Sequence, residues 1–80
     1  MPWTIYGKDN CKYCDLTKQL LTKEEMPYKY YDYLSLTEET RKTLRESTNQ
    51  KTLPMVFYNS EFIGSYEDLL NLVTYVKQFY

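Results

Sequence analysis

The sequence predicts an α/β protein whose elements follow the order strand, helix, strand, helix, strand, strand, helix. Two observations support this fold class. Short runs of β-favouring residues alternate with segments whose apolar side chains recur at helical spacing. The two cysteines, Cys11 and Cys14, also lie where the first strand gives way to the first helix. A chain of 80 residues has room for one small core, so we expect a single domain spanning residues 1–80.

The first half of the chain contains two strands separated by a helix. Residues 3–6 form an apolar run that predicts a buried strand. Leucines at helical spacing predict a helix from about residue 12 to about residue 23. Pro27 disfavours helical backbone in the residue before it, so the chain turns there. Residues 28–33 are rich in tyrosine and predict the second strand.

The next segment predicts a polar helix. Ser35 and Glu38 have the spacing of a capping box, which opens a helix that continues to about Ser47. Leu36 and Leu44 are its few apolar residues. We therefore expect this helix to pack through a narrow face.

The C-terminal third predicts a hairpin followed by a helix. Residues 55–58 and 61–63 are apolar runs joined by Asn59-Ser60, a two-residue connection that favours an antiparallel hairpin. After Gly64, several apolar residues share one helical face and predict an amphipathic helix docked on the sheet: Leu69, Leu72, Val73, Val76 and Phe79. The complete order of elements is thioredoxin-like.

The composition excludes several classes of function. Lys and Arg number 10 against 11 Asp and Glu, so no basic face for nucleic acid is expected. No segment has the length of a membrane span or the pattern of a signal peptide, so we expect a soluble, cytoplasmic protein without a membrane partner. Because the chain has ten tyrosines, we expect a core built from amphipathic rings as well as aliphatic side chains.

The motif Cys11-Lys12-Tyr13-Cys14 indicates a redox centre. Two thiols on one helical turn can form a disulfide, and the positive end of the helix dipole favours a thiolate on Cys11, the more exposed thiol. Lys8 and Lys12 add positive charge. A zinc site is nearly excluded because the chain has no histidine and no further cysteine. A purely structural disulfide this short would stabilise the fold by only about 2 kcal/mol.

Two further motifs each have a functional and a structural interpretation. In Thr52-Leu53-Pro54, the proline either simply begins a strand or follows a cis bond that turns the Leu53 backbone toward an extended ligand. In residues 64–68, the helix start either binds a carboxylate while Asp68 binds an ammonium, or is only capped by Ser65. Lys8 and Lys51 can likewise be ordinary solvated charges.

Taken together, these motifs resemble the glutaredoxin family across nearly the whole chain: Lys8, Cys11-Lys12-Tyr13-Cys14, Thr52-Leu53-Pro54 and Gly64-Ser65-Tyr66-Glu67-Asp68. The resemblance implies a thioredoxin-like fold with a four-stranded mixed sheet flanked by three helices. It also implies a groove for glutathione, the co-substrate, beside the cysteine pair. In that family the first cysteine attacks a disulfide and the second resolves the mixed disulfide, roles that fall to Cys11 and Cys14.

The resemblance also implies the glutathione contacts. It places Lys8 near the glycine carboxylate of glutathione and Tyr13 beside the glutathione sulfur. Lys51 assists at a carboxylate. Within Thr52-Leu53-Pro54, the Leu53 backbone pairs with the ligand and Pro54 is the cis proline. The γ-glutamyl group is expected at the start of the last helix, with its carboxylate near Ser65, Tyr66 and Glu67 and its ammonium at Asp68.

Two residues depart from the family pattern. Lys12 stands where dithiol glutaredoxins commonly have proline, and a cation there can lower the thiol pKa and alter the reduction potential. Ser65 stands where the family usually has a second glycine, so its side chain can weaken glutathione binding. The small size and tyrosine content are similar to virus- or phage-encoded glutaredoxins.

The resemblance implies a monomeric, glutathione-dependent thiol–disulfide oxidoreductase that reduces protein disulfides and glutathione mixed disulfides. Ribonucleotide reductase is a natural client, and no metal is expected. One alternative is a glutaredoxin-like redoxin reduced by thioredoxin reductase. Another is an iron–sulfur carrier in which two chains and two glutathiones share a cluster through Cys11. Lys12 is bulkier than the small residue usual in cluster-binding relatives, which disfavours the carrier.

Overall fold

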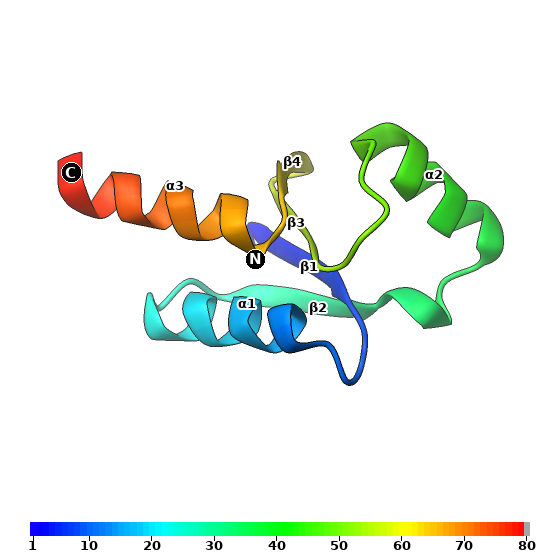
Figure 1. The fold of residues 1–80 in the computed structure, drawn as a ribbon, viewed down its shortest axis with the longest axis horizontal. Coiled ribbons are helices and arrows are strands. Elements are labelled where there is room, and N and C mark those ends of the chain that lie inside the picture. The colour runs from blue at the N-terminus through cyan, green and yellow to red at the C-terminus, as the bar shows by residue number, and fades with distance from the viewer. Residues whose placement is uncertain (80) are drawn as a thin grey trace.

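The computed structural model describes residues 1–79, and its elements follow the predicted order (Figure 1). Short loops connect them. The elements are β1 (Trp3–Gly7), α1 (Lys12–Lys23), β2 (Tyr28–Asp32), the short 3₁₀ helix η1 (Tyr33–Ser35), α2 (Glu38–Thr48), β3 (Met55–Tyr58), β4 (Glu61–Gly64) and α3 (Tyr66–Phe79).

The four strands form one mixed sheet in the order β2-β1-β3-β4. Strand β1 pairs in parallel with β2 and antiparallel with β3, and β3 pairs antiparallel with β4. The hairpin between β3 and β4 turns at Asn59 and Ser60, whose φ angles of 48° and 72° lie in the left-handed region typical of a two-residue hairpin. The predicted mixed sheet and hairpin are therefore confirmed.

Helix α2 begins differently from the prediction. Its N-cap is Thr37, whose Oγ1 accepts a hydrogen bond from the backbone N–H of Thr40 at 3.1 Å. Ser35 belongs instead to η1 and donates from its Oγ to Asp32 at 2.8 Å. The predicted capping box of Ser35 with Glu38 is thus wrong, because Asp32 competes for the Ser35 hydroxyl and ends β2 with a separate turn.

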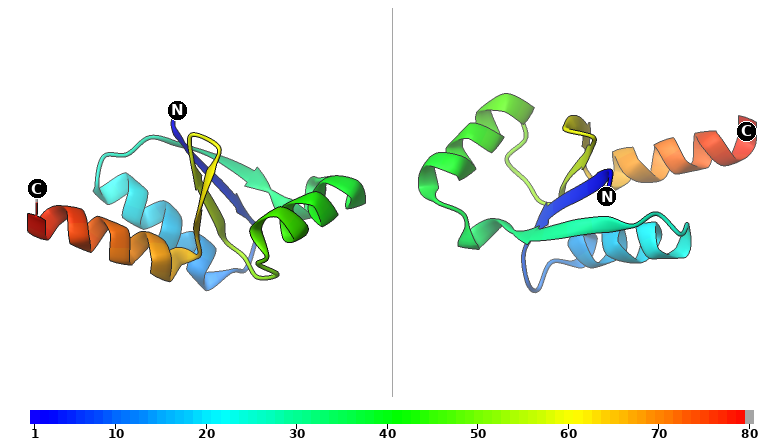
Figure 2. Two further views of the ribbon diagram at one scale, coloured as in Figure 1. Left: turned by 90° about the horizontal axis from the view of Figure 1, so that it is seen from above. Right: turned by 180° about the vertical axis from the view of Figure 1, so that it is seen from behind.

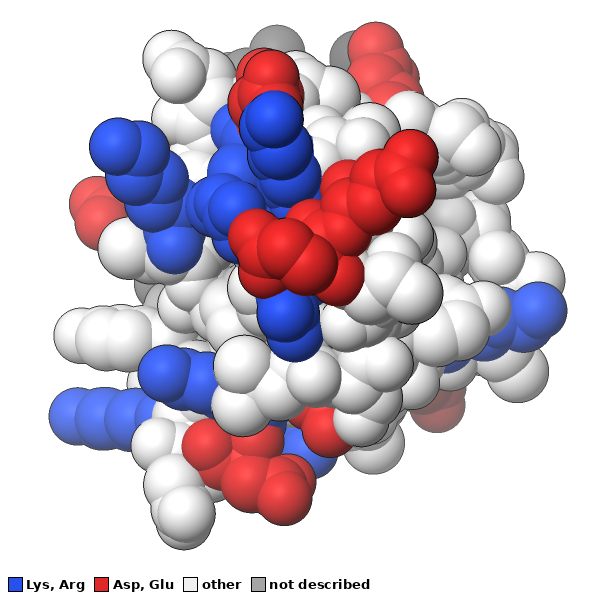
Figure 3. All heavy atoms as spheres, turned by 90° about the vertical axis from the view of Figure 1, so that its right-hand side faces the viewer, with Lys and Arg blue, Asp and Glu red and all other residues white. Residues whose placement is uncertain are grey.

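Helix α2 is also the least buried of the helices, since none of its residues is fully buried. The strands lie between α2 and α3 in the views of Figures 1 and 2. Acidic and basic side chains adjoin one another over α2 (Figure 3). Its partly buried Leu44 agrees with the predicted narrow packing face, but Leu36, the other apolar residue predicted for this helix, precedes it.

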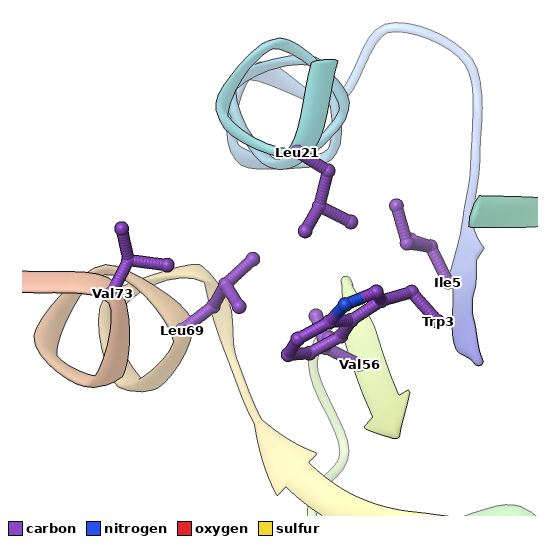
Figure 4. Packing of buried hydrophobic residues seen from close by; sticks show 6 residues of the cluster. All are labelled: Trp3, Ile5, Leu21, Val56, Leu69 and Val73. Carbon is purple, nitrogen blue, oxygen red and sulfur yellow. The ribbon is translucent and has the colours of Figure 1, made fainter. Parts of the chain in front are cut away.

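The main core lies where α1 and α3 face the sheet. Its buried side chains converge from β1, β3 and the two helices (Figure 4) and are Trp3, Ile5, Leu21, Val56, Leu69 and Val73. Tyr33 is the one buried tyrosine among the described residues. The expected mixture of amphipathic rings and aliphatic side chains is confirmed by Trp3 in the cluster and by the partly buried Tyr28 and Tyr30 packed against it. Most of the tyrosine rings stay partly in solvent, where the phenol hydroxyl keeps a hydrogen-bond partner.

Helix α3 docks on the sheet through only part of its apolar face. Leu69 and Val73 are buried, whereas Leu72, Val76 and Phe79 are 39%, 41% and 65% exposed. The C-terminal end of α3 runs out past the sheet (Figures 1 and 2), whereas Leu72 and Val76 line an open cavity beside Trp3 and Ile63. The prediction of one continuous docked face is therefore wrong for Leu72, Val76 and Phe79. No helix within residues 1–79 is both long and apolar enough to cross a membrane.

Candidate active site

The cysteine pair lies at the N-terminus of α1, where the loop after β1 ends. Cys11 is the N-cap residue, with extended backbone at φ −121° and ψ 106°, and its Sγ accepts a hydrogen bond from the backbone N–H of Cys14 at 3.2 Å. The two cysteines form a disulfide with their Cα atoms 5.2 Å apart. The free N–H groups at the start of a helix carry partial positive charge. A capping side chain lies next to them, so they stabilise a thiolate on Cys11 after reduction.

The two sulfurs differ in access to solvent. Cys14 is fully buried, whereas Cys11 is partly exposed. The prediction that Cys11 is the more accessible thiol is confirmed. Cys11 is therefore accessible to an external disulfide, whereas the buried Cys14 is not.

Two neighbouring cavities share Thr52 and Leu53, and together they form what we call the active-site groove. The Cys11 cavity, of about 460 Å³, is lined by Lys8, Cys11, Tyr33, Leu34, Lys51, Thr52 and Leu53. The Tyr13 cavity, of about 450 Å³, is lined by Tyr13, Thr52, Leu53, Pro54, Ser65, Tyr66 and Glu67. The tertiary structure thus brings together residues from four separate segments of the chain. Of the predicted site residues, only Cys14 and Asp68 line neither cavity.

The turn before β3 forms the floor shared by the two cavities. The Leu53–Pro54 peptide bond is cis, as the family resemblance implied, and Pro54 is buried. The Gln50 side chain holds this turn, because its Nε2 donates to the carbonyl of Thr52 at 2.8 Å and to that of Pro54 at 2.9 Å. Since β3 begins only at Met55, Leu53 precedes the sheet ladder, and it lines both cavities.

The start of α3 is held by a local capping contact. Asp68 Oδ2 accepts hydrogen bonds from the Ser65 backbone N–H at 2.8 Å and from the Ser65 hydroxyl at 3.0 Å. Gly64 has φ +131°, and a Cβ there would collide with the Asp68 carboxylate. In this contact Ser65 is the donor and Asp68 the acceptor, so Asp68 rather than Ser65 supplies the accepting side chain. Asp68 Oδ1 lies outside this contact.

Aromatic rings form one wall of the Tyr13 cavity. The ring centroids of Tyr13 and Tyr66 are 5.9 Å apart, and Tyr13 is 54% exposed. Tyr13 follows Cys11 closely on the first turn of α1. A ligand sulfur bonded to Cys11 would therefore lie next to an apolar, solvent-facing surface.

Sequence reasoning missed two residues of the Cys11 cavity, Tyr33 and Leu34. They belong to η1, which the sequence analysis treated as the end of a strand and a loop. The Tyr33 hydroxyl donates to the carbonyl of Arg41 at 3.3 Å and accepts from Arg45 at 3.0 Å, while Arg41 donates to the carbonyl of Leu34 at 3.1 Å. Helix α2 thereby fixes η1 beside Cys11. No local pattern signals these contacts, because they join residues seven to twelve positions apart.

Within residues 1–79 there is no group of three or more His, Cys, Asp or Glu side chains that could bind a metal ion.

Comparison with known proteins gives a consistent result. The glutaredoxin family model matches residues 3–63. Glutaredoxin-2 of Schizosaccharomyces pombe is 37% identical over 73 residues, which cover 89% of this chain and 66% of that protein. Glutaredoxin 1 of Rickettsia prowazekii is 35% identical over 69 residues, covering 85% of this chain and 73% of that protein. This chain therefore spans about two thirds to three quarters of the length of these relatives.

A solved structure shows the same fold. The holo form of glutaredoxin C1 from Populus tremula x tremuloides superposes with a TM-score of 0.83 at 28% identity, covering 92% of this chain and 68% of that chain. The thioredoxin-like fold predicted from the order of elements is confirmed.

Proposed function

This chain belongs to the glutaredoxin family, and from that premise we propose that it is a glutathione-dependent thiol–disulfide oxidoreductase. Cys11 attacks one sulfur of a client disulfide, forms a mixed disulfide and releases the other sulfur as a thiolate. Cys14 then attacks the Sγ of Cys11, which releases the second client thiolate and leaves the Cys11–Cys14 disulfide. Two electrons pass to the client, and two protons convert its thiolates to thiols.

The observation that carries this proposal is the position of Cys11 in the groove. The exposed cysteine lies in a cavity that continues, through Thr52 and Leu53, into a second cavity that reaches the start of α3. A thiol tripeptide bonded to Cys11 could therefore extend along this groove. The second cysteine is buried behind the first, which suits a resolving thiol.

We propose the following placement of glutathione. Lys8 and Lys51 lie with Cys11 in one cavity and would hold a carboxylate, while the Leu53 backbone would pair with the cysteinyl amide. Ser65, Tyr66 and Glu67 at the start of α3 would hold the γ-glutamyl carboxylate through backbone N–H groups. Asp68 would accept the ammonium on Oδ1, since Oδ2 already binds Ser65.

A coupled assay tests the source of electrons. The oxidised protein is supplied either with glutathione, glutathione reductase and NADPH, or with thioredoxin reductase and NADPH, and a glutathionylated peptide is the substrate. We expect turnover with the glutathione system only. Turnover with thioredoxin reductase and none with glutathione would replace this proposal with the redoxin alternative.

We further propose that residues 1–80 act as a monomeric single domain with ribonucleotide reductase among its clients. The described core includes residues from Trp3 to Val73, which supports one folding unit. Sedimentation gives the oligomeric state, and turnover of oxidised ribonucleotide reductase with glutathione tests the client. A stable dimer would contradict the monomer. Absence of electron transfer to ribonucleotide reductase would contradict its place among the clients.

A further inference from the structure

The cavity beside Cys11 is lined by basic side chains and by no acidic side chain of the described residues. The basic side chains are those of Lys8 and Lys51. Lys12 follows Cys11 directly and is exposed. The chain as a whole has a net charge of −1, so this local excess of cations does not follow from composition.

Elsewhere in the described part of the chain, five basic side chains form salt bridges, and only Lys23 and Lys29, which line neither cavity of the groove, do not. Salt bridges among the described residues engage Arg41, Arg45 and Lys42 on α2, Lys18 on α1 and Lys77 on α3. No salt bridge within that part of the chain involves Lys8, Lys12 or Lys51.

The acids closest in sequence do not neutralise Lys12. Asp15, one turn further along α1, pairs with Lys18 at 3.5 Å. Asp9 lies in the loop before Cys11 and forms no salt bridge with a described residue. The ammonium of Lys12 is therefore available to an external carboxylate.

Lys12 also lies outside the proposed glutathione contacts. It lines neither cavity of the active-site groove. Its Nζ is 5.9 Å from the centroid of the exposed Tyr13 ring, on the solvent side of the helix start. A substrate that fills only the groove has no need of this cation, whereas a polypeptide bonded through its cysteine to Cys11 extends beyond the groove.

We propose that Lys12 selects protein clients whose reactive cysteine is flanked by Asp or Glu. This inference names the client class of the thiol–disulfide exchange proposed above and rests on that exchange. The chemistry is unchanged: the Cys11 thiolate attacks a client sulfur, and Cys14 then displaces the client. Lys12 acts before the bond forms, because attraction between opposite charges raises the rate at which the client meets Cys11.

The test compares two cyclic disulfide peptides of equal length that differ only in flanking residues, Asp and Glu in one and Asn and Gln in the other. The protein is first reduced with dithiothreitol and desalted, so that one turnover needs no glutathione. The bimolecular rate constant for each peptide is measured by acid quench and separation of the oxidised protein. The ratio of the two constants cancels any effect of Lys12 on the reactivity of the Cys11 thiol.

We expect the acidic-to-neutral ratio to fall about two- to fivefold in Lys12→Gln, the size typical of one exposed charge pair. Lys12→Arg should keep the ratio. In the wild type the ratio should fall toward the Lys12→Gln value in about 0.5 M salt. The matched control is Lys23→Gln, an exposed lysine in the last turn of α1, roughly 16 Å along the helix from Lys12, which should leave the ratio unchanged.

An unchanged ratio in Lys12→Gln, or an equal fall in Lys23→Gln, would overturn this inference. If neither peptide oxidised the reduced wild-type protein, the proposed thiol–disulfide exchange would be rejected together with the inference. If the coupled glutathione assay showed no turnover but the acidic-to-neutral ratio still fell in Lys12→Gln, only the glutathione dependence would be rejected.

Discussion

At the scale of single residues, the two cysteines have the same chemistry but different positions. Cys11 caps α1 and is accessible, whereas Cys14 is buried one turn later. These positions support the proposed roles of attack for Cys11 and resolution for Cys14. Each role can be removed separately.

We expect Cys14→Ser to keep the reduction of glutathione mixed disulfides and to lose most reduction of protein disulfides. Only the second reaction needs an internal thiol to release the client. Cys11→Ser should abolish both. The coupled assay with each substrate measures this, and substantial turnover by Cys11→Ser would contradict the assignment.

We expect reduced Cys11 to react with iodoacetamide at pH 7 faster than a free cysteine, because the helix start and nearby lysines favour its thiolate. The midpoint of its rate against pH should lie below the value of about 8.5 for a free thiol. Mass spectrometry identifies the modified cysteine. Faster modification of Cys14 would reverse the proposed roles.

Asp68→Asn tests the proposed ammonium contact while preserving the cap. An asparagine oxygen can still accept from Ser65, so α3 should keep its start, but the charge is lost. Since a hydrogen bond to a charged group is worth at most about 3 kcal/mol, kcat/KM for a glutathionylated substrate should fall about five- to hundredfold, mainly through KM. Equal kinetics for Asp68→Asn and the wild type would exclude Asp68 from the ligand site.

At the scale of elements, α2 is held by polar contacts rather than by a buried face. Glu38 accepts from Arg41 at 2.8 Å and from Arg45 at 3.1 Å, and both arginines also bind η1. Hydrogen bonds from these arginines hold the pKa of Glu38 below its ordinary value of 4.5. An ionised Glu38 therefore helps to orient the two arginines that bind η1.

This role of ionised Glu38 predicts a pH effect. Because folding lowers the pKa of Glu38, its stabilising contribution is complete above pH 4.5 and is lost as the pH falls through the lower, folded-state pKa. Glu38→Gln should reduce stability at pH 7 and make no difference at a pH below that value. Urea unfolding of both proteins from pH 7 to pH 2 measures this. A constant difference across that range would contradict the prediction.

At the scale of the whole molecule, one core joins α1, α3 and the sheet, while half of the apolar face of α3 contributes little to it. Leu69 and Leu72 show this difference in burial within one helix. Leu69 is fully buried, and Leu72 is 39% exposed.

We expect Leu69→Ala to lower the free energy of unfolding by about 2–5 kcal/mol, because it removes buried apolar surface and leaves a cavity. Leu72→Ala should cost less than about 1 kcal/mol, since its side chain is partly in solvent before the change and alanine favours helix. Urea unfolding measures both. Equal losses would show that the outer face of α3 is covered in solution.

The sequence by itself determined the order of elements, the cysteine pair at a strand-to-helix junction and the hairpin at Asn59-Ser60. Each is a local property, set by side-chain periodicity, backbone conformation or neighbours in the chain. Tertiary structure decided what depends on distant contacts: the depth of α3 in the core, the use of Ser35 by Asp32 rather than by α2, and the place of Tyr33 and Leu34 beside Cys11. These outcomes depend on which surfaces pack together and which hydrogen-bond partners compete in the folded chain. Local sequence patterns do not contain that information.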